Sequence, residues 1–115
     1  MISHVYIGIT DFSRALAFYA ALTEELGLVL KFLEPEVPWA AWMRADVARP
    51  LLVIGHPYNG RTADPGNGQM VALLAGSRDA VDRCYGIAIG HGAVCDGPPG
   101  LRPHYHPNYY GALFS

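Results

Sequence analysis

Two histidines near the C-terminus, His104 and His106, are separated by one residue. In an extended chain both side chains project to the same side, as two metal ligands or two proton carriers would. Pro103 and Pro107 bracket the pair and favour a loop over a regular strand. Polar and aromatic neighbours surround the pair: Arg102, Tyr105, Asn108, Tyr109 and Tyr110. Three interpretations stay open: a surface loop whose histidines only form hydrogen bonds, a wall of a ligand pocket, and a metal pair that includes His4.

His4 lies in an apolar run at the N-terminus, where residues 2–9 predict a largely buried strand. Strand alternation places His4 and Tyr6 on one face and Val5 and Ile7 on the other. His4 is then a hydrogen-bonded histidine inside a sheet, a pocket residue without a metal, or a metal ligand.

Two tryptophans, Trp39 and Trp42, fall in one predicted strand and point to opposite faces, so at most one of them faces a cleft. Core packing is the favoured interpretation for either tryptophan, and Trp42 is the one expected to contact a ligand if a tryptophan lines the cleft. His56 ends the next predicted strand, at the rim of such a cleft, and its alternative is a plain exposed histidine.

Several function classes lack their signatures. There is no GxSxG nucleophile motif, no P-loop and no GxGxxG after a strand. The net charge is −2, and the eight basic residues form no run, which argues against nucleic acid and anionic membranes as partners. The N-terminus does not resemble a signal peptide, so we expect a cytoplasmic protein whose partners are a small molecule and a second copy of itself.

The elements that must position these residues follow from periodicity and turn signals. Asp11 is a predicted N-cap for a helix over residues 12–26 that ends at Gly27. Pro57–Gly68 is rich in turn residues, and the module boundary is predicted there, with module 1 at residues 1–57, a linker at 58–68 and module 2 at 69–115. A second helix begins after Ser77 and ends near residue 89. Strands are predicted at residues 28–34, 39–45, 50–56, 69–75, around 94–95, and at the end of the chain after a loop over 97–100.

The sequence pattern of the first module repeats in weaker form at an offset of 66 residues, so that Met70 is equivalent to His4. In the repeat, Met70-Val-Ala-Leu-Leu74 is equivalent to the first strand, Ser77 is equivalent to Asp11, and Tyr85 is equivalent to Tyr19. The same offset moves the strand at 50–56 to 116–122, which lies outside the sequence. The second module is therefore expected to lack its last strand, and either a second chain or an unusual C-terminal arrangement is expected to cover the unpaired edge.

A duplicated βαβββ unit that opens with I-x-H-V-x-I-x-I-x-D and continues with F-Y-x(6)-L-G-L resembles the vicinal oxygen chelate superfamily. That superfamily includes glyoxalase I, extradiol dioxygenases and the bleomycin- and fosfomycin-resistance proteins. The resemblance implies an α+β fold of two βαβββ modules that curl around a cleft, commonly in a dimer.

The resemblance also implies a divalent metal held by a histidine on the first strand, a His or Glu at the equivalent site of the other module, and a late carboxylate. His4 matches the first ligand, whereas Met70 occupies the second position and is a weak ligand for such ions. No residue matches the third. We therefore expect no cofactor, with a divalent metal on His4 and His106 as the alternative.

The function that this implies is binding of a small molecule in the cleft of a curved sheet without the complete metal site. One alternative is a metal-dependent lyase or dioxygenase-like enzyme, and another is a degenerate dimeric interaction module. The residues expected to contact the ligand are His4, Tyr6, Trp42, His56, Met70, His104, His106, Tyr109 and Tyr110.

Overall fold

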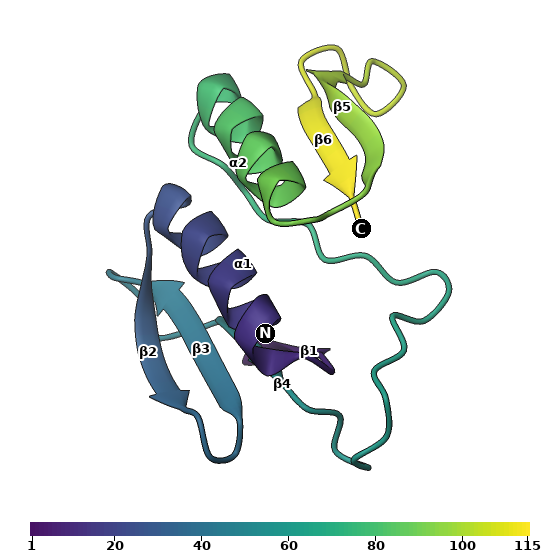
Figure 1. The fold of residues 1–115 in the computed structure, drawn as a ribbon. Coiled ribbons are helices and arrows are strands. Elements are labelled where there is room, and N and C mark those ends of the chain that lie inside the picture. The colour runs from purple at the N-terminus through teal and green to yellow at the C-terminus, as the bar shows by residue number, and fades with distance from the viewer. The chain divides into compact units, whose positions relative to one another are not determined.

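The computed structural model describes residues 1–115, and the chain forms two compact units, Met1–Ala72 and Leu73–Ser115. Figure 1 shows the helices and strands of each unit. No helix is both long and apolar enough to cross a membrane.

The first unit is a βαβββ module. Its elements are β1 (His4–Gly8), α1 (Phe12–Glu25), β2 (Leu28–Glu34), β3 (Trp39–Arg44) and β4 (Leu51–Gly55). They form one four-stranded sheet in the order β1-β4-β3-β2, in which β1 runs parallel to β4 and the other neighbours are antiparallel. The predicted order of elements in this module is confirmed.

Helix α1 begins where its sequence provides a cap. The Asp11 carboxylate accepts a hydrogen bond from the Arg14 amide at 3.2 Å, and Gly27, with φ of +75°, ends the helical region. Thr23, which the helical pattern places away from the apolar face, is instead only 1% exposed. Its hydroxyl donates to the Tyr19 carbonyl oxygen at 2.6 Å, so the buried polar group is satisfied within the helix itself.

The two faces of this sheet have different neighbours. Helix α1 covers one face, where Ala40, Trp42 and Ile54 form a buried cluster with Ile7, Ile9, Phe12, Ala15, Leu16, Tyr19 and Leu28. We call the opposite side the helix-free face. Its cluster consists of Ala41, Leu51 and Val53, with Phe32, Trp39 and Met43 packed against them.

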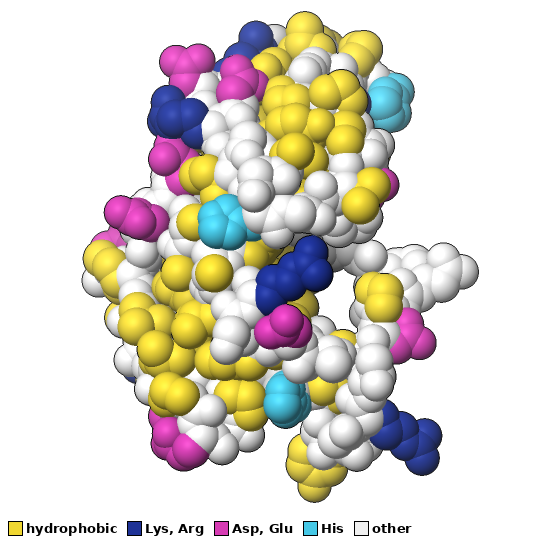
Figure 2. All heavy atoms as spheres, viewed as in Figure 1, with side chains coloured by type: hydrophobic (Ala, Val, Ile, Leu, Met, Phe, Trp, Pro, Cys, Tyr) yellow, Lys and Arg dark blue, Asp and Glu magenta, His cyan; other side chains and the backbone are white.

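Edge strand β2 exposes apolar side chains. Leu30 is 51% exposed and Leu33 is 39% exposed. Figure 2 shows hydrophobic side chains gathered over β2 and α1, with charged groups scattered among them. One edge of β2 has no strand partner in its sheet.

The second unit contains α2 (Arg78–Gly90), β5 (Cys95–Leu101) and β6 (Tyr110–Phe114). As predicted, Ser77 caps the helix, and its side chain accepts from the Ala80 amide at 3.0 Å. The prediction of a loop over residues 97–100 is wrong, because these residues belong to β5. Strand β5 pairs only with β6, and the register of the pairing shifts on both sides of Gly97. Because a proline has no backbone N–H to donate, Pro98 and Pro99 are tolerated in this irregular part of a two-stranded sheet.

The prediction of a strand at residues 69–75 is also wrong, since this segment joins neither sheet. Met70 is 71% exposed and Leu74 is 94% exposed. The chain is thus an α+β protein with one complete βαβββ module, followed by a helix and a two-stranded sheet that represent a truncated second module.

Candidate functional site

The helix-free face carries His4 and Tyr6 on edge strand β1. Parallel pairing sets His4 beside Leu51 and Tyr6 beside Val53, and both β1 side chains are exposed. Val5 and Ile7 point the other way and are half-buried. Alternation along β1 therefore places His4 and Tyr6 together, as predicted.

Tyr6 is held in place by its neighbours on β4. Its hydroxyl donates to the His56 carbonyl oxygen at 2.6 Å. The ring lies over Gly55, where an added Cβ would overlap the hydroxyl oxygen. Partial burial raises the pKa of the Tyr6 phenol, so the hydroxyl stays protonated and remains a donor.

The tryptophan of this face is Trp39, whose ring packs beside Phe32 with centroids 5.0 Å apart. Its indole Nε1 is buried and has no hydrogen-bond partner. Most buried polar atoms are paired, so this unpaired donor marks a place where an acceptor is missing.

Trp42 lies on the other side of the sheet. It is 3% exposed, with its ring centroid 6.3 Å from that of Tyr19 on α1. The prediction that Trp42 contacts a ligand disagrees with this position, because a ligand reaches it only if α1 moves. Trp39 and Trp42 do point to opposite faces, and Trp39 is the less buried of the two, being half-buried.

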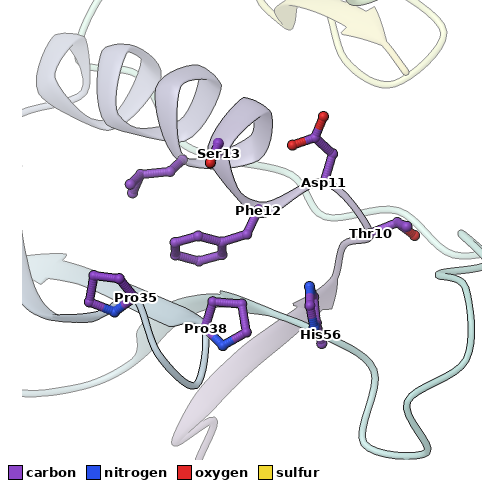
Figure 3. A pocket seen from close by; sticks show the side chains of 8 residues that line it. Thr10, Asp11, Phe12, Ser13, Pro35, Pro38 and His56 are labelled. Carbon is purple, nitrogen blue, oxygen red and sulfur yellow. The ribbon is translucent and has the colours of Figure 1, made fainter.

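His56 lines a pocket of about 610 Å³ between the start of α1 and the β2–β3 turn. Figure 3 shows its imidazole beside this pocket, with the Phe12 ring facing Pro35 and Pro38. The remaining lining residues are Thr10, Asp11, Ser13 and Leu16.

The segment that follows β5 holds the paired histidines in a loop, as the bracketing prolines predict. The rings of His104 and Tyr105 lie 4.3 Å apart, and those of His106 and Tyr109 lie 5.4 Å apart. His106 Nδ1 accepts a hydrogen bond from the Asn108 amide at 3.1 Å.

Tyr110 is the first residue of β6, and its contacts are made within the second unit. Its hydroxyl donates to the Asp82 carboxylate at 2.6 Å, and the Arg78 guanidinium carbon lies 5.3 Å from its ring centroid. The hydrogen bond to Asp82 is the main cause that raises the pKa of Tyr110. These contacts assign Tyr110 a role in joining β6 to α2.

Three solved structures share this fold. A glyoxalase/bleomycin resistance protein from Albidiferax ferrireducens T118 is 28% identical, with a TM-score of 0.79 over 99% of this chain and 86% of that chain. A member of the glyoxalase/bleomycin resistance protein/dioxygenase superfamily from Sphaerobacter thermophilus DSM 20745 is 21% identical, with a TM-score of 0.61 over 100% of this chain and 87% of that chain. TnmS3, an antibiotic binding protein from Streptomyces sp. CB03234, is also 21% identical, with a TM-score of 0.62 over 100% of this chain and 85% of that chain. No family model and no curated protein matches the sequence.

The chain has the fold of the glyoxalase/bleomycin resistance/dioxygenase superfamily.

The metal site that this superfamily implies does not fit the residues present. Within each unit, no group of three or more His, Cys, Asp or Glu side chains is placed to hold a metal ion. His4 Nδ1 lies 3.3 Å from the Ser3 hydroxyl, and Met70 is exposed in a segment without a strand. A metal-bound histidine donates from its second nitrogen, whereas His106 Nδ1 accepts.

Sequence reasoning missed Gly55 and left Trp39 out of the residues expected to contact a ligand. Gly55 interrupts an apolar run, and a glycine inside a strand signals a close approach by another group. That signal was available in the sequence, and the group that approaches is Tyr6.

Proposed function

We propose that the protein binds a small molecule that contains a ring and a hydrogen-bond acceptor, on the helix-free face of the first unit and without the complete metal site of the superfamily. The observation that carries this proposal is the unpaired Trp39 indole N–H within an aromatic and apolar surface.

The surface around Trp39 suits a ring. Phe32 packs beside it, Met43 packs against the same buried cluster, and Tyr6 is 44% exposed on edge strand β1. Stacking against aromatic side chains contributes about 0.5–1.5 kcal/mol per pair beyond the burial of apolar area. Ligand pockets combine such surfaces with a few polar groups that fix orientation.

The unpaired indole favours a ligand with an acceptor over a pure hydrocarbon. A buried donor without a partner costs about 1–3 kcal/mol, and a ligand carbonyl or ether oxygen that reaches it recovers part of this. Because Nε1 is buried in the unliganded chain, the acceptor contacts it after the indole or a neighbouring side chain rotates.

TnmS3 supports the same class of function, since a protein named as an antibiotic binding protein has this fold. At 21% identity this likeness extends to the fold alone, so the ligand of this chain has to be found by experiment.

The two tryptophans provide matched reporters for the test. In Trp42→Phe, all indole fluorescence comes from Trp39, whereas in Trp39→Phe it comes from Trp42 under the helix. A library of ring compounds with acceptors is screened by thermal shift, and each hit is titrated against both variants. We expect the Trp39 emission to change with ligand, and the affinity of Trp39→Phe to fall about tenfold.

Trp39→Phe removes an unsatisfied donor, so this variant is expected to fold. Equal affinity in Trp39→Phe and in the wild type, or a library without any hit, would refute the proposal.

A second candidate is an interaction module that acts as a homodimer, favoured by the apolar outer edge of β2. An unpaired edge strand with exposed apolar side chains is a template for pairing with another chain. Sedimentation of the wild type and of Leu30→Lys at the same concentrations tests this. A wild type that stays monomeric would exclude the dimer.

A further inference from the structure

We propose that the pocket at the start of α1 is a second binding site, separate from the helix-free face, for an uncharged aromatic molecule with one hydrogen-bonding group. The pocket lies on the helix-covered side of the sheet and is an open hollow of about 610 Å³, a volume within the range of roughly 300–1,000 Å³ that is usual for ligand pockets.

The pocket has an apolar wall suited to a flat ring. Phe12 and Leu16 come from the first turns of α1, and Pro35 and Pro38 come from the turn between β2 and β3. The Phe12 ring faces the two proline rings (Figure 3). A planar ligand that lies against Phe12 therefore contacts apolar side chains from two separate elements.

The polar lining gathers around the end of β4. His56 contributes an imidazole, and Ser13 contributes a hydroxyl. The Thr10 hydroxyl oxygen accepts from the Ala63 amide at 2.9 Å, which leaves its proton available to a ligand. Neutral imidazole and hydroxyl groups both donate and accept, so a ligand hydroxyl or carbonyl finds a partner here.

The charge of the lining selects against anions. Asp11 is the only charged residue among the lining residues, and no lysine or arginine is present. The Asp11 carboxylate points away from the Phe12 ring (Figure 3) and accepts from the Arg14 amide. A neutral ring compound therefore fits the pocket better than a carboxylate of the same shape.

The test uses two probes of nearly equal shape, 4-methylphenol and 4-methylbenzoate, titrated into the full chain and followed by amide NMR. We expect 4-methylphenol to shift the amides of residues 10–16 and 56, and 4-methylbenzoate to bind at least tenfold more weakly. His56→Ala is expected to weaken phenol binding about fivefold, the loss of one hydrogen bond. His104→Ala, an exposed histidine in the second unit, is the matched control and is expected to change nothing.

Ser13→Trp fills the pocket from an exposed helix position and is expected to abolish binding without disturbing the core. Trp39→Phe is expected to leave phenol binding intact, which separates this site from the helix-free face. Shifts confined to residues of the helix-free face, equal affinity for the two probes, or no shift at millimolar 4-methylphenol would overturn the proposal.

Discussion

Gly55 and Tyr6 are coupled, and this coupling is open to a direct test. A Cβ at Gly55 would overlap the Tyr6 hydroxyl oxygen and lie 3.1 Å from the ring carbon that bears it. It would also lie 3.2 Å from Trp39 Cβ. Because the Tyr6 hydroxyl donates to the His56 carbonyl oxygen at 2.6 Å, the ring has no room to stay in place in Gly55→Ala.

The free energies follow from these contacts. Loss of the solvent-exposed hydrogen bond costs about 0.5–1 kcal/mol, and overpacking at the strand costs about 1–3 kcal/mol. Alanine in place of glycine recovers about 0.5 kcal/mol through the unfolded chain. We therefore expect Gly55→Ala to lower the free energy of unfolding by about 2 kcal/mol and Tyr6→Phe to lower it by about 0.5–1 kcal/mol.

The double variant separates the two contributions. Phenylalanine lacks the oxygen that a Cβ at Gly55 overlaps, and the remaining contact at 3.1 Å is tight but tolerable. Tyr6→Phe, which destabilises the wild type, is thus expected to stabilise Gly55→Ala by about 1 kcal/mol.

Urea unfolding of the four proteins, followed by circular dichroism so that Trp39 does not bias the readout, gives the coupling free energy. Costs that add within about 0.3 kcal/mol, as for independent sites, would refute the reasoning.

Three further predictions concern the caps and the tyrosines. Asp11→Ala and Ser77→Ala each remove the acceptor of a first-turn amide, so each is expected to cost about 1 kcal/mol and to raise hydrogen exchange in its own helix; a change confined to the other helix would contradict this. Burial raises the pKa of Tyr19, so the folded state favours the protonated phenol, and its stabilisation is present below about pH 10 and lost as the pH rises through the raised value. The fall in stability between about pH 8 and pH 11 is therefore expected to be smaller in Tyr19→Phe, measured by urea unfolding. Asp82→Asn is expected to lower the pKa of Tyr110, observed by carbon NMR of the ring, whereas an unchanged value would mean that the hydrogen bond to Asp82 is not the cause.

The first module was predictable because its signals are local and agree with one another. Asp11 and Gly27 bound α1 on both sides, and the strands at 28–34, 39–44 and 51–55 fall within one residue of their predicted limits. Each strand of this module finds its partner within the same module, so local pattern and tertiary pairing favour the same structure.

The choice between Trp39 and Trp42 needed information that is not local. The alternation of side chains along a strand predicts that Trp39 and Trp42 point to opposite faces. Only the packing of α1 decides which of the two faces the helix covers. The unpaired indole N–H and the approach of Tyr6 to Gly55 likewise depend on contacts between strands that are distant in the sequence.

The segment at 69–75 shows why an apolar, strand-like sequence does not guarantee a strand. In the first module β1 has a single partner, β4, which pairs with it in parallel from His4 beside Leu51 to Gly8 beside Gly55. Residues 69–75 pair with no strand of either sheet. Two hydrogen-bonded strands are needed before either is stable, and the Met70 and Leu74 side chains accordingly stay exposed. The pairing of β1 with β4 thus explains why the first copy of the repeat folds as a strand, whereas 69–75 has no such partner among the strands of the two sheets.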